Sequence, residues 1–144
     1  MRPNVRNLGA FLAGALAAAL LAGCGGSATT AQGNAAVCQA FGSQSSNVEV
    51  VAEGDVTRVL GVRAGRTSPH QGFLVRLDSG CAVVVRVEAN TDFTGTMPIQ
   101  RGTRVAVKGE YEFDPRGGVI HWTHRDPRGR HEGGYVELDG RYYQ

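Results

Sequence analysis

The sequence predicts an all-β domain, a small OB-like antiparallel β-barrel that ends in a C-terminal hairpin. Short segments alternate apolar and polar residues, Gly, Pro, Asn and Asp separate these segments, and no convincing helical periodicity follows residue 43. Five to seven such strands in about a hundred residues must cover their edges, which a small barrel or a two-sheet sandwich achieves. The long first strand, which contains a glycine, favours the barrel.

Five strands and one hairpin are expected along the domain. The first strand is rich in β-branched residues, and Gly54 marks a bulge or a bend in it. The second and third strands alternate regularly and form a hairpin with each other. Asp139-Gly140 is the strongest two-residue turn signal of the chain. The expected strands are residues 48–62, 70–77, 81–89, 103–113 and 118–124, and the C-terminal hairpin covers residues 134–143.

Residues 1–23 have the layout of a lipoprotein signal peptide. Arg2 and Arg6 precede an apolar stretch from Leu8 to Leu21, which is too short to cross a bilayer as a helix. The small residues before Cys24 resemble the bacterial lipobox, in which the cysteine becomes the lipid-carrying N-terminus. We therefore expect an exported protein of the cell envelope, lipid-anchored to a membrane through Cys24. Cleavage by the ordinary signal peptidase, with Cys24 incidental, is the alternative.

Residues 24–43 are expected to be the lipidated cysteine and a flexible tether, because Gly, Ser, Ala, Thr, Gln and Asn do not fill a core. Within this segment, residues 35–42 have the composition of one or two helical turns that end at Gly42. The folded domain is expected to cover residues 44–144.

The formal net charge of +2 comes entirely from the signal segment. Without Arg2 and Arg6, thirteen basic residues face thirteen acidic ones. A general attraction to nucleic acid is therefore not expected.

Cys38 and Cys81 remain once Cys24 is assigned to the lipid. Exported proteins most often pair two such cysteines, and a disulfide here would close a loop of about forty residues. Two buried free thiols are the alternative, because spacing alone does not fix the pairing.

Three of the four histidines and the only tryptophan lie within residues 117–135. Alternation along a strand would put His121 and His124 on opposite faces, but Asp126-Pro127-Arg128-Gly129 fits a type I turn that reverses the chain. The reversal brings His131 back toward the other two, and a fourth histidine precedes the second strand. The candidate residues for binding a metal ion or another ligand are His70, His121, His124, Asp126 and His131.

Three imidazoles and a carboxylate are zinc ligands, so the expected cofactor is a divalent metal such as zinc. Arg125, Arg128 and Arg130 flank the histidines and are candidates for holding a small anionic ligand. The spacing His-x2-His-x6-His matches no established metal motif. In the alternative interpretation Asp126 caps its own turn, Trp122 fills the core, and the histidines are exposed or satisfied by backbone hydrogen bonds.

Residues 101–144, together with HQGFLV at residues 70–75, resemble the DUF3465 family of small bacterial exported proteins of unknown function. The most specific part is GGVIHWTHRDP, followed by RH and GG, and the resemblance covers about residues 48–144. The family commonly has His-Asn-x-Asp where this chain reads Ala89-Asn90-Thr91-Asp92, so a metal centre that needs this histidine would be weakened. The resemblance implies no activity, but it implies that the motif uses His70, Gln71, His121, Trp122, Thr123, His124, Asp126, Pro127 and His131.

Three functional hypotheses follow. The leading one is a lipoprotein whose β-barrel is a binding module for a metal ion or an anionic ligand. The second is a metal- or histidine-dependent phosphodiesterase or nuclease-like hydrolase, with His124 or His131 as general base and Arg125 or Arg130 stabilising the developing charge. The third is a structural interaction protein of the cell envelope that binds partners through its sheet edges.

Overall fold

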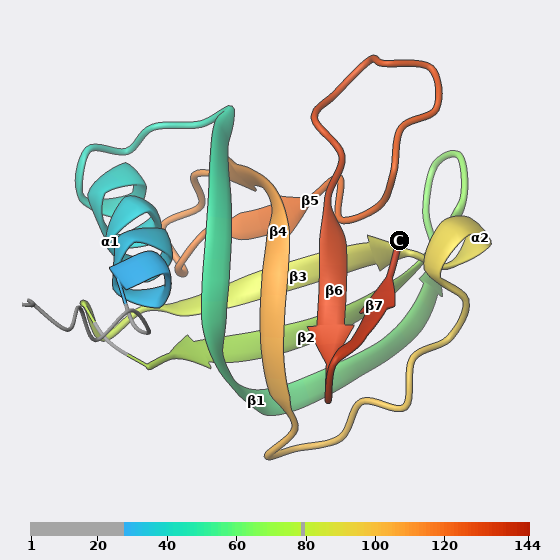
Figure 1. Cartoon of the computed structure of the whole chain (residues 1–144), viewed down its shortest axis with the longest axis horizontal. Helices are drawn as coiled ribbons and strands as arrows, with labels where there is room; N and C mark the ends of the chain where they lie inside the picture. The colour runs from blue at the N-terminus through green and yellow to red at the C-terminus, as the bar shows by residue number, and fades with distance from the viewer. Residues whose placement is uncertain (1–27, 79) are drawn as a thin grey trace, which may run out of the picture.

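Seven β-strands form one sheet, which confirms the all-β class (Figure 1). The computed structural model describes residues 28–78 and 80–144. The side chains of residues 28–32 are not described. The expected signal peptide and Cys24 therefore lie outside the described residues. The elements are α1 (Ala28–Gly42), β1 (Val48–Ala64), β2 (Pro69–Leu77), β3 (Val84–Asn90), α2 (Thr91–Thr94), β4 (Arg104–Glu112), β5 (Val119–His121), β6 (Tyr135–Leu138) and β7 (Arg141–Tyr143).

The sheet closes on itself through β1, the longest strand. Its first half pairs with β4 and its second half pairs with β2, so the order β1-β2-β3-β5-β4 returns to β1. The β3–β5 pair is parallel and the other pairs are antiparallel. Beyond this ring, β6 and β7 form the predicted C-terminal hairpin, which continues the sheet from β4.

Gly54 lies at the point where β1 changes partner, and it pairs with Leu77 on one side and Val105 on the other. A β-carbon at this position would collide with the Arg76 backbone, so the close approach of the two strands requires glycine. The sequence predicted a bulge or a bend here. The irregularities of the register lie further along β1, between Val56 and Arg58 and between Val59 and Gly61.

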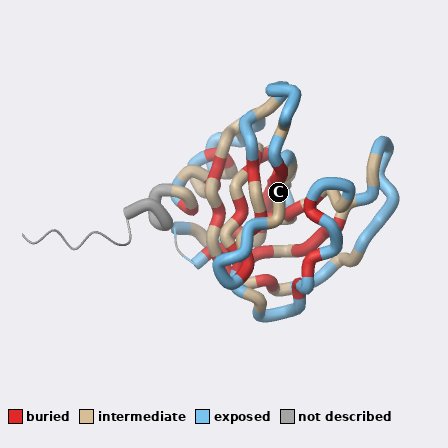
Figure 2. Tube along the Cα trace, turned by 45° about the vertical axis from the view of Figure 1, so that its right-hand side comes forward, coloured by how far each residue is buried: buried red, intermediate tan, exposed pale blue. Residues whose placement is uncertain are grey.

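The core has the alternation that the sequence predicted. Buried positions alternate with partly exposed ones along the strands, and the connecting segments carry most of the exposed residues (Figure 2). Aliphatic side chains fill most of the interior, together with two buried aromatic rings. The largest fully buried apolar side chains are Tyr111, Phe73, Ile120, Val37, Val56, Val75, Val85, Val87, Val105, Val107 and Val136.

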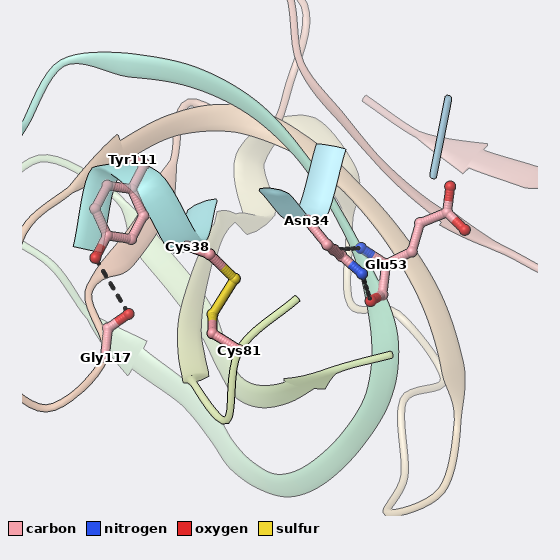
Figure 3. The surroundings of a disulfide bond; sticks show 6 residues. All are labelled: Asn34, Cys38, Glu53, Cys81, Tyr111 and Gly117. Carbon is pink, nitrogen blue, oxygen red and sulfur yellow. Dashed lines mark hydrogen bonds between the residues drawn. A yellow bond between two sulfur atoms is a disulfide. The ribbon is translucent and has the colours of Figure 1, made fainter. Parts of the chain in front are cut away.

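Helix α1 occupies most of the segment that was expected to be a flexible tether, and it includes residues 35–42, where helical turns ending at Gly42 were predicted. The structure differs here because one edge of the helix finds partners on the sheet, which composition alone does not reveal. Val37 is fully buried, and the buried Asn34 side chain both donates to and accepts from the backbone of Glu53 (Figure 3). The predicted Cys38–Cys81 disulfide is present and joins the helix to the segment before β3. In the part of the chain that the structure describes, no helix is long and apolar enough to cross a membrane.

Strand β5 is shorter than expected. The predicted strand 118–124 begins at Val119 and ends at His121, because Trp122 takes a left-handed backbone conformation with φ of 56°. Trp122 is also 38% exposed, so the interpretation in which it fills the core is wrong.

Candidate functional site

Two glutamates and a histidine meet on the outer face of β4 and β5. Glu110 and Glu112 lie two residues apart on β4, so they point to the same face while Tyr111 between them points into the core. His121 pairs directly with Glu110 across the antiparallel β4–β5 ladder. We call Glu110, Glu112 and His121 the strand site.

The His121 ring nitrogen Nε2 lies between the two carboxylates. It is 3.6 Å from Glu110 Oε1 and 3.7 Å from Glu112 Oε1, beyond normal hydrogen-bond length. This nitrogen is buried and has no hydrogen-bond partner, although the side chain as a whole is 32% exposed. Among the described residues, the strand site is the one set of three or more His, Cys, Asp or Glu whose ligand atoms lie within 4.8 Å of one another.

Burial lowers the pKa of His121, and the charges of Glu110 and Glu112 oppose this effect without overcoming it. A neutral imidazole beside two ionised carboxylates leaves two negative charges around a ring nitrogen. Metal ligands must be deprotonated, and the strand site provides three such ligands. A divalent cation therefore fits the charge and the donor types of this site.

A cavity of about 480 Å³ opens above the strand site. His121 and Glu112 form one wall, and the end of β1 and the start of β2 contribute Arg63 and His70 on the other. Arg86 and Glu88 of β3 lie between these walls and are 3.5 Å apart. The cavity therefore gathers arginine, glutamate and histidine side chains from β1, β2, β3, β4 and β5.

Residues 122–134, which we call the insert loop, leave and rejoin the same edge of β4. Glu110 pairs with His121 of β5, and Lys108 pairs with Tyr135 of β6, so β5 and β6 lie end to end along β4. Gly134 donates to the His124 carbonyl oxygen and closes the base of the loop.

Asp126 organises the insert loop. Its side chain is 98% buried, and its carboxylate accepts hydrogen bonds from the backbone N–H groups of Arg128, Arg130 and His131. Burial raises its pKa, but these three N–H donors outweigh burial, so the pKa is lower than usual. The Gly129 N–H donates to the Asp126 carbonyl oxygen and forms the predicted reversal. These contacts favour the interpretation in which Asp126 caps its own turn.

His124 and His131 pack together inside the insert loop, as the predicted reversal requires. Their ring centroids are 4.9 Å apart and perpendicular, and Phe93 of α2 stacks on His124 at 4.2 Å. Trp122 covers His131 at 4.7 Å. Burial lowers the pKa of His124, while its hydrogen bond to the Arg125 carbonyl oxygen opposes the shift. We call His124, Asp126 and His131 the loop cluster.

The structure divides the predicted ligand set. His70 and His121 line the cavity, whereas the loop cluster lies within the insert loop. No three of the five predicted residues bring their ligand atoms within 4.8 Å of one another. The Nδ1 atoms of His70, His124 and His131 contact the carbonyl oxygens of Ser68, Arg125 and Glu132. The three candidate anion-binding residues, Arg125, Arg128 and Arg130, are exposed on the loop.

Other residues of the sequence motif have structural roles. The Gln71 side chain donates to the Met97 carbonyl oxygen and accepts from the Met97 N–H, so it fixes the segment between α2 and β4. Ala89, where the family commonly has histidine, is fully buried on the core face of β3. The cavity lies on the opposite face of this strand, since Arg86 and Glu88 line it.

Glu110 and Glu112 were not among the candidate ligands predicted from the sequence. Alternation had placed both on the outer face of their strand, but the pairing that sets His121 opposite Glu110 is a tertiary contact. Two carboxylates at positions i and i+2 of one strand, followed by a histidine in the next strand, are the only local trace of this arrangement.

No curated protein and no solved structure matches the chain. The model of one family, described as a protein of unknown function, matches residues 19–144, which include the sheet, the cavity and the insert loop. The chain therefore belongs to the DUF3465 family, as its sequence motif predicted.

Proposed function

We propose that this protein is a metal-binding module of the cell envelope, in which Glu110, Glu112 and His121 hold one divalent cation. The observation that carries the proposal is the His121 Nε2 atom, which is buried without a partner between two carboxylates. An orphaned polar atom of this kind costs free energy unless a further group completes it. A cation would complete all three side chains at once.

The donor set suits zinc or a similar divalent transition metal. Carboxylate oxygens and an imidazole nitrogen are ordinary zinc ligands, and three protein ligands leave at least one coordination position for water or for an exogenous ligand. The cavity beside the strand site is where that position would open. His70 lies on the cavity wall rather than among the ligands of this proposal.

The test is zinc titration by calorimetry on protein purified without a histidine tag. We expect one zinc ion per chain, and we expect His121→Gln and Glu112→Gln each to weaken binding at least tenfold. His70→Gln is the matched control, because it removes an imidazole from the same cavity and should leave the zinc affinity unchanged. Failure of the wild-type protein to bind zinc, manganese or iron(II) would exclude the proposal.

We further propose that the closed strand order is an OB-like β-barrel. The support is the order β1-β2-β3-β5-β4 with its return to β1. OB folds bind ligands on the face of strands 2 and 3 and at the loops after strands 1 and 4, and the cavity lies in this region. The fold analogy supports ligand binding in general and identifies no ligand.

Export and lipid anchoring through Cys24 are also part of the proposal, and they rest on the N-terminal sequence alone. Radiolabelled palmitate should label the wild-type protein in cells but not the Cys24→Ser variant. The variant should also move from the membrane fraction to the soluble fraction. Equal labelling of both forms would show that Cys24 is not the lipidated residue.

Hydrolysis of phosphodiesters is the second candidate. Three protein ligands and an open cavity are typical of catalytic zinc sites, and His70 lines that cavity. His124 and His131, the general bases expected from the sequence, are buried in the insert loop, so His70 replaces them in this candidate. Zinc-dependent cleavage of bis-p-nitrophenyl phosphate that is lost in His70→Gln would establish it, and metal binding without cleavage would leave the binding module.

A further inference from the structure

The cavity above the strand site continues into a second cavity of about 450 Å³. The two share Arg86 and Val119 in their walls, so they adjoin on the outer face of β3 and β5. We call the two cavities together the trough. It extends from His70, at the start of β2, to Arg116, in the turn between β4 and β5.

The strand register explains how the trough joins the strand site. Arg58, Leu74, Arg86, Val119 and Glu112 pair in that order across β1, β2, β3, β5 and β4. Side chains that pair in this way are neighbours on one face of a sheet. One row of adjacent side chains therefore leads from the apolar part of the trough to a residue of the strand site.

The charge near the strand site changes sign when a divalent cation binds. Arg63 and Arg86 line the cavity with Glu88 and Glu112, and Glu110 completes the strand site, so the formal charge of these five side chains without an ion is minus one. A divalent cation converts this to one positive charge. Arg86 Nε lies 3.5 Å from Glu88 Oε1, and both side chains are partly exposed. Because such an ion pair contributes little free energy, the Arg86 guanidinium can bind another anion at little cost in stability. The occupied site would therefore attract an anion.

The other half of the trough is lined mainly by apolar surface. Leu60, Leu74, Val84 and Val119 line it, with Arg58 and Arg116 also in its wall. Unlike Arg86, Arg116 already makes two side-chain hydrogen bonds, both to the carboxylate of Asp114, which lines the same half of the trough. This half therefore suits a hydrocarbon chain more than a second anionic group.

We propose that the trough binds a phosphate monoester of an apolar chain, with the phosphate between the metal ion and Arg86 and the chain over Leu60, Leu74, Val84 and Val119. This inference rests on the proposed metal site. A phosphate suits the position because its several terminal oxygens contact the ion and a guanidinium fork at the same time. The chain adds affinity by burying methylene groups.

The test compares n-octyl phosphate with inorganic phosphate by calorimetry on zinc-loaded protein. Each fully buried methylene adds about fourfold in affinity, so we expect octyl phosphate to bind at least tenfold more tightly than inorganic phosphate. Chelation of the zinc should abolish both affinities. By thermodynamic reciprocity, octyl phosphate should raise the zinc affinity by the same factor as zinc raises the octyl phosphate affinity.

Two variants separate the halves of the trough. Arg86→Gln should weaken the binding of octyl phosphate and of inorganic phosphate at least tenfold and leave the zinc affinity unchanged. Leu74→Gln should reduce the preference for octyl phosphate over inorganic phosphate. Arg128→Gln, an exposed arginine of the insert loop, is the matched control and should change neither. The thermal midpoint of each variant should match that of the wild type, since both trough residues lie on the outer face of the sheet.

Different failures have different meanings. Absence of zinc binding removes the metal site and this inference together. Zinc binding without phosphate binding overturns this inference alone. Equal affinities for octyl phosphate and inorganic phosphate would exclude a binding site for the apolar chain. Phosphate binding that persists after zinc removal would exclude the bridging role of the ion.

Discussion

Three histidines share one hydrogen-bonding arrangement that the fourth lacks. The Nδ1 atoms of His70, His124 and His131 lie 2.7 to 2.9 Å from backbone carbonyl oxygens. A carbonyl oxygen only accepts, so Nδ1 carries the proton and Nε2 keeps its lone pair in the neutral ring. At His121 it is Nε2 that faces two carboxylates. Counting histidines in the sequence treats these four rings as equivalent, and their partners show that they are not.

The depressed pKa of buried His124 predicts a loss of stability in mild acid. Because the folded-state pKa lies below the ordinary value of 6.5, the unfolded chain takes up this proton first. The contribution to the free energy of unfolding is complete above pH 6.5 and falls as the pH drops from there toward the folded-state pKa. The slope for one proton is at most about 1.4 kcal/mol per pH unit.

Urea unfolding between pH 8 and pH 5, with a chelator present, measures this effect. His124→Gln should have a smaller loss of stability over the same range, even if its stability at pH 8 is lower. The charged and titratable groups that act on His124 are His131, Asp126 and His70. An unchanged slope in the variant would assign the acid sensitivity to other groups.

At the scale of elements, the insert loop interrupts what would otherwise be one continuous strand, made of β5 and β6, paired along β4. The sequence predicted a longer strand to His124 because alternation continues through Trp122. The strand ends at His121 instead, where Trp122 takes a left-handed backbone conformation and the surrounding backbone is crowded at Gly109 and Gly134. That crowding involves residues far apart in the sequence, so a local pattern does not contain it.

Gly134 and Gly133 provide a matched pair of substitutions at the base of the insert loop. A β-carbon at Gly134 would collide with the carbonyl oxygens of Trp122 and Lys108, whereas the nearest atom to one at Gly133 is Arg125 Cα at 4.0 Å. We expect Gly134→Ala to cost roughly 2 kcal/mol or more in the free energy of unfolding and Gly133→Ala less than about 0.5 kcal/mol. Equal effects in urea unfolding would mean that the loop base relaxes freely.

At the scale of the whole molecule, the sequence predicted the all-β class, the strand order along the chain, the C-terminal hairpin and the disulfide. These features follow from alternation, turn residues and cysteine counting, which are local. The predicted ligand set was also read from local clustering, and it missed Glu110 and Glu112 because their contact with His121 depends on which strands pair. Helix α1 was predicted only over residues 35–42, and its full extent was missed for the same reason, since Asn34 is held by Glu53 of β1.

The disulfide should contribute strongly to global stability, because it closes a loop with a sequence separation of 43 residues. Loop-closure entropy gives about 4 kcal/mol for a loop of this length. The double variant Cys38→Ser/Cys81→Ser should therefore unfold roughly 10–20 °C below the wild type. Calorimetric scans with and without a reductant measure this, and a reductant should have no effect on the variant. A wild-type midpoint unaffected by full reduction would show that the contacts of α1 suffice without the bridge.

If Cys24 is acylated as proposed, the attachment of α1 to the sheet also restricts the orientation of the domain on a bilayer. Four residues from Cys24 to Ala28 extend over at most about 14 Å, so an acylated Cys24 would keep the α1 end of the domain near the lipid headgroups. Phe113, at the end of β4, packs against Phe41 of α1, so the turn that carries Arg116 belongs to that same end. Helix α2 lies at the opposite end (Figure 1). The apolar end of the trough, near Arg116, would thus face the bilayer surface. The end near His70 would face the surrounding aqueous compartment.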